Sequence, residues 1–142
     1  MDIRQAQRTD CARRSELMAQ LGYRAAPDLL ERKLAAYEAT EQNCVLVGVE
    51  EGHILGVIVL NVAVPFHEDG QWGRISALVV ADGARGRGVG RALLEAGDAF
   101  FRRHGCWHVE VTSGAHRADA HRFYVANGYH DTPKRFIKAY GR

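Results

Sequence analysis

A run of glycine and arginine separates a strand-forming stretch of the chain from a helix-forming stretch. The run is Arg85-Gly86-Arg87-Gly88-Val89-Gly90-Arg91, which follows the apolar residues Ile75 to Val80 and precedes the helical pattern Ala92 to His104. A strand that leads through a glycine-rich turn into a helix exposes backbone N–H groups and the positive end of the helix dipole. Because both attract negative charge, the run predicts a site for a phosphate-bearing ligand.

The spacing of the glycines excludes two common phosphate-binding motifs. A Walker A loop needs Lys and then Ser or Thr after its last glycine, whereas Val89 to Arg91 follow Gly88 in this chain. A dinucleotide-binding turn needs glycine at the first, third and sixth positions, and counted from Gly86 the sixth residue is Arg91. The pattern that remains is Arg-x-x-Gly-x-Gly, which begins at Arg85.

The length and composition predict a single domain that spans residues 1–142. A chain of 142 residues can bury about two-thirds of its unfolded surface without disulfides or metals. The net charge of +2, with 25% charged residues, describes a surface of mixed charge. Such a surface is too weakly basic to predict nucleic-acid binding, so anion binding is expected to be local.

The cysteines and the apolar segments predict a cytoplasmic protein. The 3 cysteines show no CxxC spacing, which favours free thiols in a reducing compartment: Cys11, Cys44 and Cys106. The N-terminus is too polar for a signal peptide. The longest apolar run, Ile54 to Val64, is interrupted by Asn61 and is too short to span a bilayer. We therefore expect no insertion into a membrane.

The first half of the chain predicts a strand, two helices and a hairpin. The expected segments are a strand at Ile3 to Ala6, a helix from Thr9 or Asp10 to Gly22, a helix from Pro27 with Leu30, Leu34 and Tyr37 on one face, and strands at Cys44 to Val49 and Ile54 to Val64. Glu51-Gly52 supplies a tight turn between the last two strands. The second of these strands is apolar on both faces, which places it in the middle of the sheet with helices on both sides.

The second half of the chain predicts a strand–helix–strand unit, another helix and a tail. The expected segments are a strand at Arg74 to Val80, a helix with Val89, Leu93, Ala96 and Phe100 on its buried stripe, a strand at Trp107 to Thr112 with Trp107, Val109 and Val111 on its apolar face, a helix containing Ala120, Phe123 and Tyr124 that ends at Asn127-Gly128, and a β-like tail from Phe136 to Tyr140. A strand–helix–strand unit of this length forms a right-handed crossover, so its two strands are expected to be parallel neighbours.

Two motifs resemble those of the GCN5-related N-acetyltransferase (GNAT) family, and they occur in the family's order. One is the Arg85-x-x-Gly88-x-Gly90 turn after Leu78-x-Val80, and the other is Ala120-x-x-Phe123-Tyr124 followed by Gly128-Tyr129. Together with the order of strands and helices, the resemblance covers nearly the whole chain. It implies an α/β fold with a mixed, mainly antiparallel central sheet, one parallel strand pair that splays apart, and helices on both faces.

The resemblance implies an acetyltransferase that uses acetyl-CoA as its co-substrate and needs no metal. The backbone of three residues would pair with the pantetheine arm like an extra strand: Leu78, Val79 and Val80. Backbone amides of the glycine-rich run would hold the pyrophosphate: Arg85, Gly86, Arg87, Gly88, Val89, Gly90 and Arg91. Parallel strands that splay apart leave unpaired edge groups, which an amide-bearing ligand can satisfy. The backbone N–H near Leu78 would then face the thioester oxygen as an oxyanion donor.

Tyr124 and Glu110 are the candidate catalytic residues. Tyr124 matches the family's tyrosine, which can donate a proton to the departing CoA thiolate, and its alternative role is that of a core aromatic. Some family members carry a glutamate where this chain has Arg74. Glu110, on the polar face of the strand beside the splay, is therefore the candidate base, and its alternative role is that of an ion-paired strand residue. His108 and the turn His67-Glu68-Asp69 are further candidates for the base.

The implied acceptor is a primary amine of a small molecule or peptide that attacks acetyl-CoA directly in a ternary complex. No cysteine relay is expected, because Cys44 lies in a strand away from the splay and Cys106 at its base. Arg117 stands where the family often has Asn, and it would reach a CoA phosphate, the substrate or only solvent. The segments Gly22 to Pro27 and His130 to Arg135 would flank the acceptor. The sequence is compatible with a homodimer and with a monomer.

Three alternatives differ in the chemistry they would need. A non-catalytic acyl-CoA-binding or sensing domain would keep the fold, and Arg74 favours it because an acidic residue is missing there. A nucleic-acid-binding module would use the arginines of the glycine-rich run, but interleaved aromatics and a recognised RNA-binding motif are lacking. A metal cluster would use His104, Cys106 and His108, but the sequence places no fourth ligand. We expect neither a nucleic-acid partner nor a metal.

Overall fold

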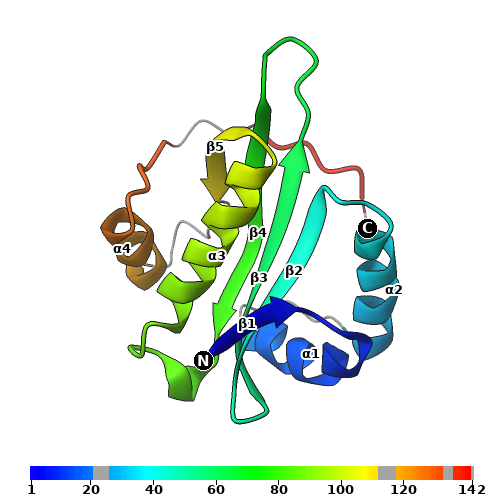
Figure 1. The fold of residues 1–142 in the computed structure, drawn as a ribbon, viewed down its shortest axis with the longest axis vertical. Helices are drawn as coiled ribbons and strands as arrows, with labels where there is room; N and C mark the ends of the chain where they lie inside the picture. The colour runs from blue at the N-terminus through cyan, green and yellow to red at the C-terminus, as the bar shows by residue number, and fades with distance from the viewer. Residues whose placement is uncertain (21–25, 112–117, 133–135, 142) are drawn as a thin grey trace. The chain divides into compact units, whose positions relative to one another are not determined.

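The computed structural model describes residues 1–20, 26–111, 118–132 and 136–141 (Figure 1). The chain separates into two compact units, Met1–Thr112 and Ser113–Arg142. The first unit contains β1 (Asp2–Gln5), η1 (Arg8–Asp10), α1 (Cys11–Gln20), α2 (Pro27–Glu38), β2 (Asn43–Glu50), β3 (His53–Ala63), β4 (Gln71–Val80), η2 (Asp82–Ala84), α3 (Val89–Arg103) and β5 (Cys106–Val111), and the second contains α4 (Ala118–Ala126). The single domain expected over residues 1–142 stays a prediction.

The first unit is built on a sheet that, among the described residues, has five strands in the order β1-β2-β3-β4-β5. The first three pairs of neighbours are antiparallel, and β4 and β5 are parallel. These pairings confirm the mixed, mainly antiparallel sheet and its parallel pair. They also place β3, the strand that is apolar on both faces, in the centre of the sheet, as the sequence predicted.

Helices cover both faces of this sheet. A Cβ on Gly97 of α3 would lie 3.3 Å from Leu60 of β3, so Leu60 faces α3. The next residue, Asn61, donates a hydrogen bond of 3.0 Å from its side-chain nitrogen to the hydroxyl of Tyr37 in α2. Successive side chains of a strand point to opposite faces, so α2 and α3 lie on opposite sides of the sheet. In Figure 1, α3 crosses in front of the strands.

The core is formed by apolar side chains of the sheet and of the helices that cover it. The largest fully buried ones are Leu17 of α1, Val47 of β2, Val57, Ile58 and Leu60 of β3, Ile75 of β4 and Leu93 of α3. Side chains at adjacent positions of β3 are buried on opposite faces, which explains why this strand lacks the polar alternation of a strand with one wet face. No helix among the described residues is both long and apolar enough to span a bilayer.

Local sequence signals set several boundaries of the elements. α2 begins at Pro27, whose fixed φ suits the first helical position. Gly128 closes α4 with a φ of 91°, in the left-handed region that favours glycine. The Gly128 N–H donates to the Val125 carbonyl at 3.1 Å, and the Tyr129 N–H to the Tyr124 carbonyl at 3.0 Å. This is a Schellman motif, so the predicted cap at Asn127-Gly128 is confirmed.

Other boundaries differ from the sequence-based expectation. The predicted strand from Phe136 to Tyr140 is wrong, because residues 136–141 contain no strand and the large side chains there are exposed. A strand needs a neighbour that supplies hydrogen bonds, and an apolar pattern alone does not provide one. α3 begins at Val89, the first residue of the predicted buried stripe, so the end of the glycine-rich run forms the first helical turn. The expected helix stop at Gly22 and strand end at Thr112 lie outside the described residues.

The predicted apolar face of β5 is wrong at Trp107. Gln71 pairs with Cys106 and Trp72 with His108, so Trp107 is the extra residue of a β-bulge. The bulge leaves Trp107 58% exposed. Beyond it the alternation holds, because Val109 pairs with Gly73, where an added Cβ would meet the Phe101 ring of α3.

Candidate active site

The glycine- and arginine-rich run connects η2 to the start of α3. Gly86 and Gly88 have φ values of 79° and 82°, a backbone conformation that side chains disfavour. Gly88 is the N-cap of α3, so no N-cap side chain accepts a hydrogen bond from the N–H groups of the first turn, and the first turn carries no acidic residue. This end of the helix therefore keeps the positive character that an anion requires.

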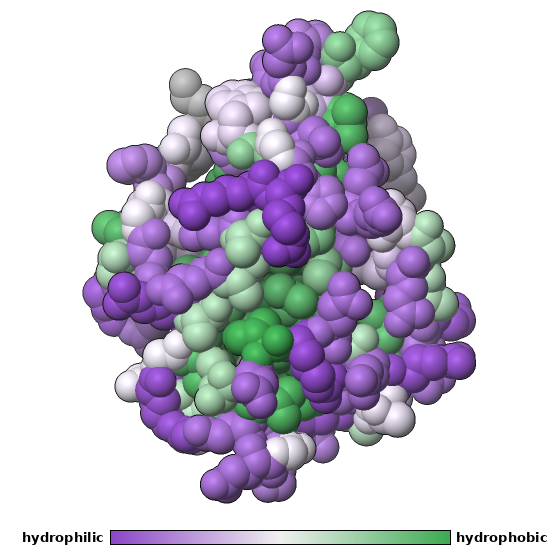
Figure 2. Space-filling model, viewed as in Figure 1, coloured by the Kyte–Doolittle hydropathy of each residue, from purple (hydrophilic) through white to green (hydrophobic). Residues whose placement is uncertain are grey.

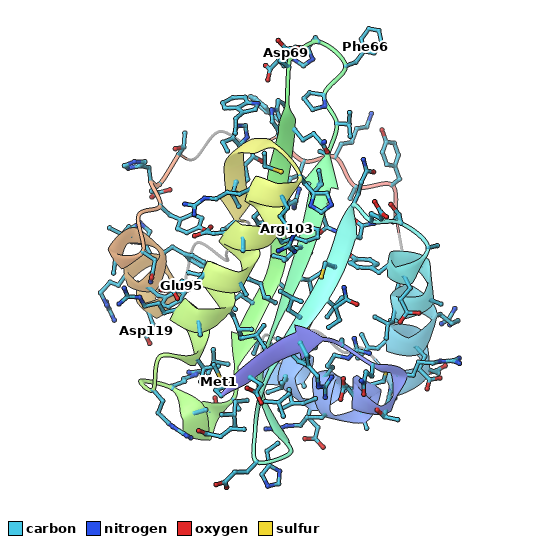
Figure 3. The ribbon with its side chains drawn as sticks, viewed as in Figure 1. Met1, Phe66, Asp69, Glu95, Arg103 and Asp119 are labelled. Carbon is cyan, nitrogen blue, oxygen red and sulfur yellow. The ribbon has the colours of Figure 1, made fainter. Side chains whose placement is uncertain are left out.

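The arginine side chains of the run lie beside carboxylates. Arg85 Nη2 is 3.1 Å from Asp82 Oδ1, Arg91 Nε is 3.3 Å from Glu95 Oε1, and Arg87 Nη2 donates to Glu50 Oε2. Figure 3 shows Glu95 on the outer side of α3. Exposed ion pairs of this kind contribute little to stability, but they compensate the guanidinium charges. The backbone N–H groups of the run are thus the hydrogen-bond donors that remain available to an anion.

β4 extends beyond its pairing with β5. Among the described residues, the parallel pairing reaches Ile75 and Val111, the last described residue of β5, whereas β4 runs on to Val80. At this point β4 also bulges against β3, because Val59 pairs with Ala77 and Leu60 with Ile75, which leaves Ser76 as the extra residue. Within the described part of the chain, the outer edge of β4 from Ala77 to Val80 has no strand partner. Its free backbone groups can pair with an extended ligand.

Gly56 of β3 brings the end of β4 and the first turns of α3 together. A Cβ on Gly56 would lie 3.0 Å from the Val79 carbonyl oxygen, 3.1 Å from Val89 Cγ1 and 2.9 Å from Leu93 Cδ1. Only glycine allows α3 to approach the sheet this closely. The segments predicted to bind the pantetheine arm (Leu78 to Val80) and the pyrophosphate (Arg85 to Arg91) therefore lie at the same end of the first unit.

Glu110 and His108 lie side by side on β5. Glu110 is one residue before the end of the parallel pairing, and its side chain is 63% exposed. Its Oε1 lies 3.4 Å from Nε2 of His108, although this contact lacks hydrogen-bond geometry and Nε2 is buried. The His108 ring stacks on Trp72, with a centroid distance of 5.2 Å and an interplanar angle of 29°. The imidazole is thus held in place beside the carboxylate.

The turn His67-Glu68-Asp69 belongs to the tip of the β3–β4 hairpin. Glu68 accepts a hydrogen bond of 3.2 Å from Trp72 Nε1. Figure 3 shows Phe66 and Asp69 at the tip, at the opposite end of the sheet from the run before α3. Phe66 is fully exposed there, and Figure 2 shows a small pale green area within the otherwise mostly hydrophilic tip. Glu110 is therefore better placed than Asp69 to act near the end of the β4–β5 pairing.

Tyr124 lies on α4, in the second unit. Burial raises the pKa of Tyr124 to about 12, so its hydroxyl stays protonated at neutral pH. Its ring makes edge contacts with Phe123 and Tyr129, at centroid distances of 5.3 Å and 5.5 Å. Arg117 lies outside the described residues, as do parts of the two segments expected to flank the acceptor.

The sequence analysis missed a set of polar residues on the face of the sheet opposite α3. Asn61 Nδ2 donates to Tyr37 Oη and Asn43 Oδ1, both at 3.0 Å, and Asn61 Oδ1 accepts from Ser76 Oγ at 2.8 Å. The signal was present, because Asn61 interrupts an otherwise apolar central strand. Asn61 is half-buried, and these hydrogen bonds offset the cost of removing its amide from water.

Two other features give no support to a different site. A surface pocket of about 370 Å³ is lined by Thr9, Asp10, Arg13, Gly52, His53 and Ile54, none of which is an expected site residue. Within the described ranges, no three His, Cys, Asp or Glu side chains are grouped to hold a metal ion. His104 instead contacts the Phe100 carbonyl through Nδ1, at 2.9 Å.

The sequence of the chain also matches a known protein family. The model of the acetyltransferase (GNAT) family matches residues 10–129. The chain therefore belongs to the GNAT family of acetyltransferases.

Individual relatives show the same relationship. The chain is 33% identical over 93 residues to an aminoalkylphosphonate N-acetyltransferase of Salmonella typhimurium, and the match covers 66% of this chain and 60% of the relative. A transcriptional regulator from Bacillus halodurans has a similar structure, with a TM-score of 0.87, 21% identity and 99% of each chain covered. Glucosamine-6-phosphate N-acetyltransferase from Arabidopsis thaliana matches with a TM-score of 0.81 and 21% identity, over 99% of this chain and 98% of that one. At these identities the two structures show the shared fold alone.

Proposed function

We propose that the protein transfers the acetyl group of acetyl-CoA to a primary amine in a ternary complex. The observation that carries this proposal is that the edge of β4 that no described strand covers and the uncapped start of α3 meet at Gly56. An open strand edge suits the amides of a pantetheine arm, and a helix N-terminus suits a pyrophosphate.

In the proposed complex, the backbone of Leu78, Val79 and Val80 pairs with the pantetheine arm. Backbone amides hold the pyrophosphate, from Arg85, Gly86, Arg87, Gly88, Val89, Gly90 and Arg91. The carboxylates beside the arginine side chains support this emphasis on the backbone. The arginine side chains, whose charges these carboxylates balance, then contribute less to binding than the backbone N–H groups.

The proposed reaction needs one proton acceptor and one proton donor. Glu110 takes a proton from the acceptor's ammonium group, whose nitrogen then attacks the thioester carbon. The N–H near Leu78 stabilises the negative charge that develops on the thioester oxygen. As the carbon–sulfur bond breaks, Tyr124, which is protonated at neutral pH, donates its proton to the thiolate. The nitrogen, which still carries two protons, then gives one to the tyrosinate, so that a neutral amide and a neutral thiol leave.

A cysteine relay does not fit this mechanism. A cysteine nucleophile acts as its thiolate, and burial raises the pKa of both Cys44 and Cys106. We therefore infer direct attack by the amine, without an acetylated enzyme. The free thiols are also the basis for the proposed cytoplasmic location.

The name of the Salmonella relative suggests an acceptor for the first assays. That protein is an aminoalkylphosphonate N-acetyltransferase, so we propose a small primary amine that also carries an anionic group. Larger acceptors, such as a peptide amine, are less consistent with this relative.

A thiol-release screen tests the proposed function. The purified protein is incubated with acetyl-CoA and a panel of amines, and free CoA is followed with a thiol reagent. We expect amine-dependent release above the hydrolysis seen without an amine. Tight binding of acetyl-CoA with no release for any amine would instead support a non-catalytic sensing domain, which Arg74 favours because some family members have a glutamate there.

A further inference from the structure

A row of polar side chains crosses four strands of the sheet. Its members are Asn43 of β2, Asn61 of β3, Arg74 of β4 and Glu110 of β5, and each is the Cα partner of the next. Residues paired in register share one face of a sheet. Asn61 bonds to Tyr37 of α2, so the row faces away from α3. We call these four residues the polar row.

The polar row differs from the row that backs it. At the neighbouring positions of the same strands, Cys44, Leu60, Ile75 and Val111 form an apolar row toward α3. The sheet is therefore apolar on one face and charged on the other at this level. Arg74 and Glu110 are exposed to solvent, so the charged end of the polar row is accessible to a small molecule.

The polar row ends at the point where the reaction is proposed to occur. Ser76, the bulge residue of β4, donates to Asn61 and so joins the row just before the open edge of β4 begins. Asn61 is held from two more sides by Tyr37 and Asn43. An amide with all these contacts has a fixed orientation, which suits a preorganised binding surface.

We propose that the polar row is the acceptor subsite and that the acceptor is a small zwitterion. Its ammonium group lies at Glu110 and its anionic group at Arg74. This inference rests on the proposed acetyltransferase function and assigns the acceptor class to particular residues. Arg74 attracts a carboxylate or phosphonate and repels a second ammonium group, so polyamines are disfavoured.

The spacing of the strands limits the length of the acceptor. Neighbouring strands lie about 4.8 Å apart, so Arg74 and Glu110 suit an amine and an anion separated by one or two carbon atoms. The next row on the same face contains Trp72 and His108, whose stacked rings form an aromatic boundary. A longer or bulkier acceptor would have to extend over these rings.

The test compares acceptors of matched size and different charge. The probes are 2-aminoethylphosphonate and β-alanine as zwitterions, propylamine as a plain amine, and 1,3-diaminopropane as a dication. We expect a higher kcat/KM for the zwitterions. In Arg74→Gln, the KM for the zwitterions rises by about tenfold or more, since a charged hydrogen bond is lost, and the preference for the zwitterions over propylamine falls by the same factor, while the KM for acetyl-CoA stays the same.

Two control variants and a binding measurement separate the possible outcomes. Arg102→Gln removes an exposed arginine of α3 and leaves the preference intact, and Arg74→Lys restores part of it. The subsite would be overturned if wild type had the same kcat/KM for propylamine and the zwitterions. It would also be overturned if Arg74→Gln lowered kcat/KM equally for all amines. Acetyl transfer itself would stand in both cases. If no amine is acetylated, the proposed function fails, and calorimetry with 2-aminoethylphosphonate then decides the subsite. Binding to the wild type but not to Arg74→Gln supports the polar row, and equal or absent binding overturns it.

Discussion

Tyr124 is the residue for which the structure gives the clearest chemical property. The side chain is half-buried, and burial raises its pKa to about 12, so the protonated form persists over the pH range of ordinary assays. Burial of an aromatic in a core would have the same effect on the pKa. The two roles are therefore separated by kinetics and not by titration.

The variant Tyr124→Phe removes the proton donor and keeps the ring. If Tyr124 protonates the CoA thiolate, we expect kcat to fall on the order of 100-fold, because general acid catalysis contributes this much. The Kd of acetyl-CoA, measured by calorimetry, is expected to stay unchanged. Full turnover in Tyr124→Phe would leave Tyr124 with a packing role only.

Glu110 lies beside His108, and either side chain is able to accept a proton. We expect Glu110→Gln to lower kcat/KM on the order of 100-fold, because the amide cannot accept the proton of the ammonium group. Glu95→Gln, on the exposed side of α3, serves as the control. An unchanged kcat/KM in Glu110→Gln would move the base to another residue, and His108→Gln would be the next variant.

At the scale of elements, a partly buried ion pair between Arg4 and Asp10 fixes β1 to η1, the turn that precedes α1. Asp10 accepts hydrogen bonds from Arg4 at 2.8 Å and 3.0 Å and from the Gln7 N–H at 2.7 Å. The hydrogen bonds from Arg4 hold the pKa of Asp10 below its ordinary value of 3.8. A depressed pKa means that the stabilisation is present above pH 3.8 and is lost as the pH falls through the folded-state pKa.

Asp10→Asn is expected to lower the free energy of unfolding by about 1–2 kcal/mol at pH 7, because charged hydrogen bonds are replaced by weaker ones. The difference between wild type and variant is expected to shrink as the pH falls below 4, which urea unfolding at several pH values can follow. Asp69→Asn at the exposed hairpin tip is the control. A difference that does not change with pH would show that the carboxylate's charge is not what stabilises this junction.

The contact between α3 and the sheet at Gly56 links stability to ligand binding. Gly56→Ala places a Cβ within 3.1 Å of Val89, Leu93 and the Val79 carbonyl. We expect a loss of about 1–3 kcal/mol in the free energy of unfolding and a weaker affinity for acetyl-CoA, since α3 must move away from β4. Gly83→Ala, where an added Cβ meets nothing within 4 Å, is expected to change the stability little. If Gly56→Ala bound acetyl-CoA as tightly as the wild type, the close approach of α3 to β4 would not be needed for binding.

At the scale of the whole molecule, local patterns predicted most elements of the fold. Pro27 marked the start of α2, Glu51-Gly52 the turn of the β2–β3 hairpin, and Gly128 the end of α4. The glycine-rich run was correctly placed between β4 and α3. Each of these signals acts through the conformation or hydrogen bonds of a few neighbouring residues, so the sequence alone reveals it.

Features that depend on register between strands were not predicted. The bulges at Ser76 and Trp107 arise from pairing with β3 and β4, and neither residue type marks a bulge by itself. The polar row joins Asn43, Asn61 and two charged residues that lie far apart in the chain. Its members align only when β2, β3, β4 and β5 pair in one particular register. The alternation of apolar and polar residues within each strand does not specify that register.

The measurement that tests the central claim most directly follows an isotope-labelled acetyl group from acetyl-CoA. The protein is mixed with labelled acetyl-CoA and 2-aminoethylphosphonate, and mass spectrometry examines both the amine and the protein. We predict that the label appears on the amine nitrogen in an amount equal to the CoA released, with none on the protein. Label on a cysteine would contradict direct acetyl transfer by this protein. The same holds if the protein binds CoA but neither 2-aminoethylphosphonate nor any amine of the thiol-release screen becomes labelled.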